Sequence, residues 1–283
     1  MSIFNLFGER AKTRIDEVRL ERISDFSDFK RVADFLYEKS GIVDLDKRVL
    51  TSSSLQRYAT SRNVHSTSEF ISRMKSDPLF YQEVINIATV NETFFMREIK
   101  ELEWLVDYIA DSSKTLKILS MPCSSGEEIY SILLLMSIKN VALGKVEIYG
   151  CDINSNAVEK AKKGEYEERS LHKLDERVRN EYFTINEKGR YAVSQNFKNK
   201  ANFSQKNIFD SLDSEERYDV ILSRNMFIYF DDEKRALATK IIANALNTGG
   251  LFIKGHADHI YKRSKLEYVR YGVYKKVLEN KTL

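Results

Sequence analysis

The chain has 283 residues, enough for one large domain or two, and its 42% hydrophobic and 31% charged residues are typical of a soluble globular protein. A net charge of only +3 gives no support for nucleic-acid binding, and no apolar run is long enough to span a membrane. The apolar stretch at the start of the sequence is interrupted by charged residues and is too short for a signal peptide, so we expect a cytoplasmic protein without direct membrane insertion.

The first part of the chain, from about residue 24 to residue 88, has the apolar spacing of α-helices. Ser40-Gly41 is a helix-ending signal, and Asp77-Pro78 is a helix-starting signal with aspartate as cap and proline at the first helical position. The helices expected from these patterns cover about Phe26–Ser40, Asp44–Arg62, Ser68–Met74 and a fourth from Pro78. They form a predicted all-helical N-terminal domain of residues 1–90.

The predicted helix Asp44–Arg62 is rich in basic side chains. Two interpretations of this charge remain open. It is either an ordinary solvated face or a docking surface for an acidic protein partner. The basic residues are Lys47, Arg48, Arg57 and Arg62.

A polar segment, Asn91–Glu98, joins the helical part to a long predicted helix over Glu98–Asp111. An asparagine, a threonine and an arginine stand there beside two phenylalanines. The segment is either a capped helix start with core phenylalanines or a polar lip over a ligand pocket.

A buried strand is predicted over Leu116–Met121, followed by a turn of small residues and an apolar helix over Glu127–Ile138. Strand, small-residue turn and helix form the first unit of a nucleotide-binding α/β sheet. The turn has one glycine, Gly126, so the G-x-G-x-x-G fingerprint is absent. The two carboxylates at the helix start would repel a pyrophosphate and attract a cation, which favours S-adenosylmethionine over NAD. Acidic residues also occur in first helical turns because of the helix dipole.

The two cysteines, Cys123 and Cys151, fall at the ends of predicted strands. We expect both to be buried free thiols, and we predict neither a disulfide nor a metal site. The second strand, Lys145–Cys151, ends in Asp152, 26 residues after Gly126. An acid at this place binds ribose hydroxyls in such sheets. Asp152 could equally cap the following helix, Ser155–Lys163.

Short alternating runs, Arg190–Ser194 and Ala201–Ser204, follow a predicted helix over Asp175–Tyr182. They predict a small antiparallel insertion, at about residues 175–206, beside the parallel sheet. The chain then returns to the sheet through Asn207–Asp210 and a buried strand over Tyr218–Ser223.

The last part of the chain begins with Arg224 and Asn225, which follow that strand and therefore lie on the ligand side of the sheet. Asp231 or Asp232 starts a helix to about Leu246, which Asn247–Gly250 ends. The remaining predictions are a strand at Leu251–Lys254 and a closing hairpin of Glu267–Tyr271 and Val273–Val277. His256 either lines the pocket or is a structural histidine.

Several motifs in this order resemble the CheR-type chemotaxis receptor glutamate methyltransferases, from about Phe26 to Tyr274. The motifs are FKRVADFLYEKSGIV, NETFFMRE, SSGEEIYSI, CDIN with KAKKGEY, SRNMFIYFDDE and GGLFIKGH. The resemblance implies a Rossmann-like α/β methyltransferase sheet over residues 91–283. It also implies S-adenosyl-L-methionine as cofactor and S-adenosyl-L-homocysteine as product.

Carried over by motif, the resemblance implies a set of site residues drawn from the lip and from four strand ends. The lip residues that would contact the cofactor are Asn91, Thr93 and Arg97, and the contacts from the first two strand ends would come from Glu128 and Asp152. The adenine would lie beside Asn207 and Ile208, and the pocket would be completed by Arg224 and Asn225. Arg97 and Tyr229 would lie nearest the transferred methyl group and are the expected catalytic residues.

The implied reaction esterifies glutamate side chains on the cytoplasmic domain of chemoreceptors. A glutamate has a pKa of roughly 4.3, so the nucleophile is already ionised and needs no general base. Ser52-Ser53-Ser54 dilutes the charge of the basic helix, which leaves open a methyltransferase of this fold acting on another protein or a small molecule. A non-catalytic S-adenosylmethionine-binding signalling module is the other alternative. Some members of the family that this chain resembles hold a receptor's C-terminal peptide with a glycine-rich loop of the insertion. The corresponding loop here, Asn186–Gly189, is short and not glycine-rich, so the resemblance implies no such tether.

Overall fold

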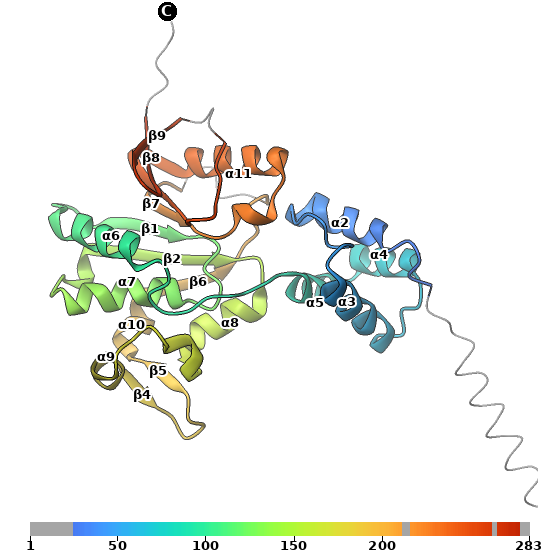
Figure 1. The fold of residues 1–283 in the computed structure, drawn as a ribbon, viewed down its shortest axis with the longest axis horizontal. Helices are drawn as coiled ribbons and strands as arrows, with labels where there is room; N and C mark the ends of the chain where they lie inside the picture. Colours follow the sequence, from blue (N-terminus) through green and yellow to red (C-terminus); the bar gives the residue numbers. More distant parts are fainter. Residues whose placement is uncertain (1–24, 211–215, 262–264, 278–283) are drawn as a thin grey trace, which may run out of the picture. The chain divides into compact units, whose positions relative to one another are not determined.

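The computed structural model describes residues 25–210, 216–261 and 265–277. The chain divides into two compact units. The described residues up to Glu38, together with Asp44–Ala88, form a helical unit, while Lys39–Val43 and the described residues from Thr89 onward form an α/β unit (Figure 1).

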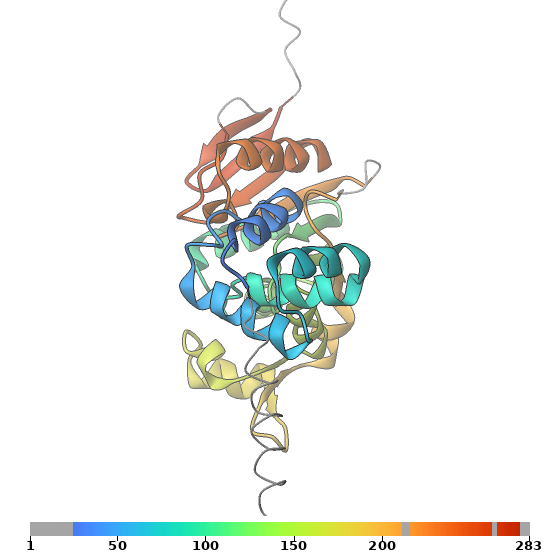
Figure 2. The same ribbon diagram turned by 90° about the vertical axis from the view of Figure 1, so that its right-hand side faces the viewer.

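Within residues 25–88 the helices are α2 (Lys30–Ser40), α3 (Val49–Ser61), α4 (Thr67–Ser76) and α5 (Pro78–Ala88) (Figure 2). The expected start of α5 is confirmed, because Asp77 Oδ1 accepts hydrogen bonds from the backbone N–H groups of Leu79 and Phe80 at 3.1 and 3.0 Å. Helix α3 begins at Val49 and not at Asp44, since Asp44 has a left-handed φ of 57° that a helix cannot include.

The α/β unit is built on a seven-stranded sheet in the order β6-β2-β1-β7-β8-β10-β9 (Figure 1). Strands β6 to β8 in that order are parallel, and β10 and β9 form the antiparallel closing hairpin that the sequence predicts. The strands are β1 (Leu116–Ser120), β2 (Val146–Asp152), β6 (Ala201–Gln205), β7 (Tyr218–Ser223), β8 (Leu246–Lys254), β9 (Leu266–Arg270) and β10 (Val273–Lys276).

Helices cover both faces of this sheet, because neighbouring residues of a strand point to opposite sides. Ile118 packs with α6 and α7 in one core, and Leu119 packs with α11 in the other. Helix α8 lies on the α7 side, where Tyr130 donates a hydrogen bond to the backbone oxygen of Ala161 at 2.9 Å. The helices are α6 (Ile99–Asp111), α7 (Glu127–Ile138), α8 (Ser155–Lys163) and α11 (Asp232–Ala245), with a short 3-10 turn η1 at Leu143–Lys145.

A second, three-stranded antiparallel sheet is inserted after α8, as the sequence predicts, but its extent differs from the prediction. The predicted insertion strand Ala201–Ser204 is wrong: it is β6, the outer strand of the main sheet, parallel to β2. Its short polar alternation fits a sheet edge of either kind, so the pattern could not separate the two. The inserted elements are β3 (Glu165–Tyr166), η2 (Glu168–Leu171), α9 (Glu176–Tyr182), β4 (Phe183–Ile185), β5 (Tyr191–Val193) and α10 (Gln195–Lys200).

Other expectations have mixed outcomes. Asp231 caps α11, as one of the two candidates, by accepting a hydrogen bond from Lys234 N–H at 2.9 Å. The prediction that Asn247–Gly250 ends this helix is wrong, because these residues already belong to β8, where Gly249 takes a φ of 78° beside a register shift.

Cys123 and Cys151 are buried free thiols, as predicted. No helix of the described residues is both long and apolar enough to cross a lipid bilayer.

The segment Lys39–Val43, here called the strap, belongs to the α/β unit although it lies within the N-terminal part of the sequence. Val43 N–H donates to the backbone oxygen of Tyr229 at 3.1 Å, and Asn207 donates its side-chain amide to the backbone oxygen of Lys39 at 2.7 Å. Gly41 at the strap's centre has a φ of 72°, and a Cβ there would meet the ring of Phe209 at 2.7 Å.

Replacing Gly41 by alanine should therefore lower the free energy of unfolding by about 1–3 kcal/mol, from left-handed strain plus overpacking. Chemical denaturation followed by circular dichroism measures the change. Gly144→Ala is the matched control, because nothing lies within 4 Å of a Cβ at that position, and its effect should stay within about 0.5 kcal/mol. Equal stability of the Gly41→Ala and unsubstituted proteins would contradict the strap's packing role.

Candidate functional site

Five of the predicted site residues lie at or after the carboxyl ends of the parallel strands. Strands β1, β2 and β6 extend in one direction across the sheet and β7 and β8 in the other, so the order reverses between β1 and β7. Ligands of open α/β sheets bind outside the carboxyl ends at this reversal. Glu128 follows β1, Asp152 ends β2, Asn207 follows β6, and Arg224 and Asn225 follow β7.

Asp152 is 4% exposed and faces the turn after β1. Its Oδ2 accepts a hydrogen bond from Ser124 N–H at 2.8 Å, and its Oδ1 accepts one from Asn154 N–H at 2.8 Å. Burial raises the pKa of Asp152 to about 6, against the opposing effect of these backbone hydrogen bonds. The alternative that Asp152 caps α8 is wrong, because Asn154 is the cap and accepts from Ala157 N–H at 2.9 Å.

Arg224 lies at the centre of the site with a side chain only 3% exposed. Its Nη1 pairs with Glu128 Oε2 at 2.7 Å, and its Nη2 pairs with Glu98 Oε2 at 3.2 Å. The same Nη2 donates to the backbone oxygen of Arg97. Glu128 also accepts from the Ser120 hydroxyl at 2.8 Å. The guanidinium thus joins the end of β7 to the start of α7 and to the residues just before α6.

Glu98 supplies the second carboxylate of this cluster. It also accepts from the side-chain amide of Asn225 at 3.3 Å and from His256 N–H at 3.1 Å. Burial alone would raise the pKa of Glu98, but the positive charge of Arg224 and the Asn225 hydrogen bond outweigh it and lower the pKa. Glu98 is therefore ionised at neutral pH.

The two glutamates at the start of α7 have different environments. Glu127 is 2% exposed, accepts a hydrogen bond from the Ser125 hydroxyl at 2.8 Å and has a pKa raised by burial. Glu128 instead faces Arg224. Only the second of the two carboxylates therefore takes part in the charge cluster at the sheet edge.

Asn225 takes a left-handed φ of 60° directly after β7. Its backbone N–H donates to the carboxylate of Asp258, a fully buried acid that also accepts from Gly255 N–H at 3.0 Å and Ile228 N–H at 3.3 Å. Burial raises the pKa of Asp258, against these hydrogen bonds. Asp258 therefore fixes the turn that presents Asn225 and leads to Tyr229.

The segment Asn91–Glu98 is anchored by Phe95, which is fully buried and stands edge-on to Tyr166 and Phe183. Arg97 stays partly exposed; its Nη1 donates to the Glu92 backbone oxygen at 2.6 Å, and its guanidinium lies 5.9 Å from the Phe94 ring centre. Thr93 is half-buried and Asn91 exposed. Phe95 is a core phenylalanine, as one of the two interpretations expects, but no side-chain hydrogen bond caps the start of α6, where Glu98 takes a left-handed φ of 48°. The polar lip over a ligand pocket stays a prediction.

Asn207 and Ile208 follow β6, but their side chains are already engaged within the protein. Asn207 binds the strap and also accepts from Phe209 N–H at 3.2 Å, while Ile208 is 4% exposed in the α11-side core. Tyr229 ends the 3-10 turn η3 (Phe227–Tyr229) and is half-buried. Its backbone oxygen accepts from Val43 of the strap at 3.1 Å.

Several residues at the site were missed in the sequence interpretation. Glu98, Ser124 and Asp258 each organise a predicted site residue through a carboxylate or a backbone N–H. The sequence could have indicated Glu98, because it is an acid that directly follows the predicted site residue Arg97 in the motif NETFFMRE. Nothing in the local pattern marks Asp258, because its partner Asn225 lies 33 residues away.

The edge fits a cationic nucleoside. The Ser124 hydroxyl oxygen is buried without a hydrogen-bond partner among the described residues, beside the carboxylate of Asp152. Ser124 and Gly126 both take left-handed φ values, 47° and 92°, and a Cβ at Gly126 would meet Ala161 at 2.9 Å. The edge has three carboxylates, those of Asp152, Glu98 and Glu128, and the guanidinium of Arg224 is the cation paired with two of them. A hydroxyl-bearing sugar and a positive group therefore suit these residues.

Comparison with known proteins gives a consistent picture. The family model described as "CheR methyltransferase, SAM binding domain" matches residues 91–274. A chemotaxis protein methyltransferase of Campylobacter jejuni is 36% identical over 224 residues, covering 79% of this chain and 85% of that protein. Chemotaxis protein methyltransferase 2 of Vibrio cholerae is 34% identical, covering 86% and 89%. The chemotaxis protein methyltransferase of Escherichia coli is 28% identical, covering 84% and 87%.

The pKa of Asp152, about 6 in the free protein, predicts how cofactor affinity depends on pH. If Asp152 has the predicted ribose contact, sugar hydroxyls donate hydrogen bonds to its ionised carboxylate, so that binding favours ionisation and requires a proton to leave Asp152 at low pH. Affinity for S-adenosylhomocysteine should be constant above about pH 7 and fall by up to about tenfold per unit below the pKa. Calorimetry across this range measures it.

The variant Asp152→Asn should bind about 10–100-fold more weakly at neutral pH and lose this pH dependence, since it keeps the shape but not the charge. Asp175→Asn is the matched control, because Asp175 is an exposed helix cap of α9. It should retain both the affinity and the pH profile. An Asp152→Asn variant with unchanged affinity would refute the ribose role.

Proposed function

The chain belongs to the CheR methyltransferase family, and from this premise we propose that it transfers the methyl group of S-adenosylmethionine to glutamate side chains of chemoreceptors. S-adenosylmethionine-dependent methylation in chemotaxis is the function of the family. The proposal adds the acceptor group, a glutamate carboxylate that becomes a methyl ester, and the partner, the cytoplasmic domain of a receptor. Such a partner places the reaction in the cytoplasm.

The observation that carries the proposal is that the Arg97 guanidinium has hydrogen-bond donors left for a ligand. It is partly exposed at the lip, and among the described residues it forms no ion pair, only a hydrogen bond to the Glu92 backbone oxygen and a ring contact with Phe94. Its remaining donors suit a planar carboxylate, which a guanidinium binds through two parallel hydrogen bonds. Arg224, by contrast, is already paired with two acids.

The chemistry needs little more from the protein than alignment. Bound S-adenosylmethionine supplies a methyl group on a positively charged sulfur. Arg97 orients the incoming carboxylate, whose oxygen forms the new bond to the methyl carbon while the sulfur–carbon bond breaks. Tyr229, set by the 3-10 turn and its backbone bond to the strap, borders the path of the methyl. Because the nucleophile is ionised at neutral pH, no residue has to remove a proton.

The remaining polar residues at the edge have binding roles in this proposal. Asp152 accepts hydrogen bonds from the ribose hydroxyls, and Glu128 and Glu98 keep the edge negative toward the sulfonium. Asn91 and Thr93 contact the cofactor from the lip, and Asn225 and Arg224 close the pocket on the β7 side. Asn207 and Ile208 flank the adenine. In this role Asn207 uses its backbone and the turn it stabilises, since its side-chain amide already binds the strap.

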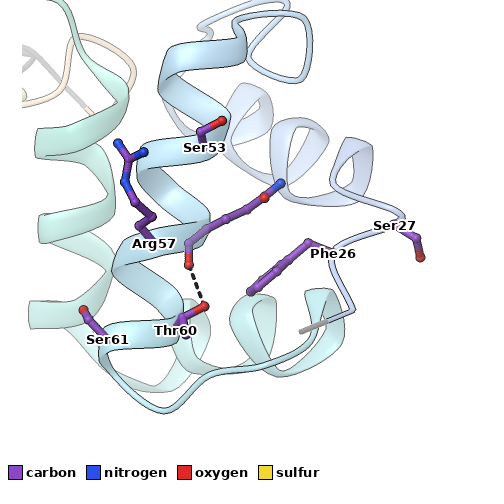
Figure 3. A pocket seen from close by; sticks show the side chains of 7 residues that line it. Phe26, Ser27, Ser53, Arg57, Thr60 and Ser61 are labelled. Carbon is purple, nitrogen blue, oxygen red and sulfur yellow. Dashed lines mark hydrogen bonds between the residues drawn. The ribbon is translucent and has the colours of Figure 1, made fainter. Parts of the chain in front are cut away.

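Helix α3 supports a protein as the methyl acceptor. Val49 and Leu50 at its start are 72% and 85% exposed, which is unusual for adjacent aliphatic side chains. A shallow pocket lies further along the same helix, with Arg57 and a row of hydroxyls around it (Figure 3). We assign this surface to the acidic helices of a receptor. The hydroxyls are those of Ser53, Thr60 and Ser61, with Phe26, Ser27 and Gln56 completing the lining.

The inserted sheet supports a receptor partner without a peptide tether. The turn between β4 and β5 closes tightly, with Gly189 N–H donating to the Asn186 oxygen at 2.9 Å and Asn186 N–H donating to the Arg190 oxygen at 2.9 Å. Such a short, internally bonded turn presents little backbone to a peptide.

The first test is methyl transfer from radiolabelled S-adenosylmethionine to the receptor cytoplasmic fragments of the source organism. The label should enter the receptor and be released by mild base, because carboxyl methyl esters hydrolyse readily and N-methyl groups do not. Receptor fragments with glutamine in place of the acceptor glutamates are the control and should stay unlabelled. Base-stable label, or transfer only to another protein or a small molecule, would overturn the acceptor assignment.

Removal of the lip guanidinium should slow turnover more than it weakens cofactor binding. Arg97→Ala is expected to reduce kcat by about 100-fold, the typical cost of losing one charge-stabilising donor in an active site. Arg97→Lys should fall between, since it keeps the charge but not the paired donors. Kinetics with receptor fragments and calorimetry with S-adenosylhomocysteine separate the two effects.

Arg177→Ala is the matched control, because the Arg177 side chain is 91% exposed and lies on α9 of the inserted sheet. Its turnover should equal that of the unsubstituted protein. If Arg97→Ala keeps both turnover and cofactor affinity, the proposed role of Arg97 is wrong.

A further inference from the structure

Beside the cofactor edge, three side chains from two distant segments come together: Glu98 and Glu101 at the start of α6, and His256 directly after β8. One donor atom from each lies within 4.8 Å of the others. His256 Nε2 stands 2.9 Å from Glu101 Oε1, and His256 N–H donates to Glu98 Oε2 at 3.1 Å. One imidazole nitrogen with two carboxylate oxygens is a donor set that zinc accepts.

Glu101 is the member of this group that its protein contacts leave incompletely explained. The residue is 5% exposed, and its Oε1 is used by His256. Its Oε2 is buried and has no hydrogen-bond partner among the described residues. A buried carboxylate oxygen without a partner is costly, and a bound ion or water is the usual explanation. The unpaired atom thus belongs to the most buried member of the group.

The group is covered on one side and open to solvent on the other. Gly272, with a φ of 76°, covers the Glu101 side chain, and a Cβ there would lie 3.6 Å from its Cγ. The His256 side chain is 43% exposed, with its ring 5.2 Å from that of Tyr271, so the group opens to solvent on this side. Zinc–ligand distances of about 2.0–2.2 Å put the donors of a tetrahedral site roughly 3.4 Å apart. Separations of up to 4.8 Å within the group therefore have to shorten, while the 2.9 Å contact between His256 Nε2 and Glu101 Oε1 has to lengthen.

We propose that Glu98, Glu101 and His256 form a binding site for a divalent transition-metal ion, with zinc as the ion of choice and water in the remaining coordination position. The site goes beyond methyl transfer and does not depend on the identity of the methyl acceptor. Glu101 contributes the oxygen that is otherwise unpaired, and His256 contributes Nε2. Glu98 contributes a carboxylate lone pair that is not used by Arg224, Asn225 or the His256 backbone N–H.

The test is a titration of the full-length, chelator-treated protein with zinc chloride at neutral pH, in competition with a fluorescent zinc indicator. One equivalent of zinc should bind per chain. His256→Gln should weaken binding by about 100-fold or more, since even outer partners of zinc ligands contribute 10–100-fold. His259→Gln is the matched control, because His259 is exposed three residues away, and it should bind zinc as the unsubstituted protein does.

A second measurement keeps the test independent of folding defects. Zinc should raise the thermal unfolding temperature of the unsubstituted protein and of His259→Gln, but not that of His256→Gln. Glu101→Gln should lose the shift as well, yet Glu101 is buried, so the exposed His256 provides the decisive variant. Absence of stoichiometric binding, or equal binding by His256→Gln, overturns the site. Neither methyl donor nor acceptor is present, so the outcome does not bear on the proposed methyl transfer.

Discussion

The Arg224 guanidinium, held inside the protein between the carboxylates of Glu98 and Glu128, is the interaction on which the cofactor edge depends. It joins three pieces of chain that are far apart in sequence: the end of β7, the start of α7 and the lip before α6. A buried ion pair adds little net stability, but removal of one partner leaves an uncompensated charge that costs about 3–5 kcal/mol. Through the backbone oxygen of Arg97 the same group holds the end of the lip, just before α6 begins. Arg224 therefore acts mainly by positioning these three segments, and less by adding to the stability of the fold.

The charge distribution around this guanidinium has a clear division. Acids that face the ligand edge, such as Asp152, Glu98 and Glu128, are met by backbone N–H groups, hydroxyls or the single arginine. Glu127 and Asp258 have partners outside this cluster, the Ser125 hydroxyl and the Asn225 backbone N–H, and burial raises the pKa of both, as it does for Asp152. A cationic ligand arriving at the edge is balanced by charge already ordered in the protein, so little reorganisation is needed when it binds.

Most of the fold could be predicted from local patterns, because the parallel strands are short apolar runs and the helices carry clear start signals. The edge strand Ala201–Gln205 could not be assigned, since its polar alternation is the same whether it joins the main sheet or the insertion. At the site, strand-end position identified Asp152 and Arg224. The partners of these residues were harder to predict: Glu98 and Asp258 act through contacts that span 126 and 33 positions, and nothing local encodes such distances. The direct ligand contacts of the named residues stay predictions.

The strap limits where the chain can be cut to make separate fragments of the two units. Because Lys39–Val43 belongs to the α/β unit while the residues on both sides of it belong to the helical unit, the chain passes between the two units three times. No single cut separates them. A fragment starting at residue 91 would lack the partners of Asn207 and of the Tyr229 backbone, and would uncover the rings of Phe209 and Phe230 where Gly41 packs. Chimaeras between relatives that exchange the two halves at residue 90 would likewise join a strap from one protein to a pocket from another.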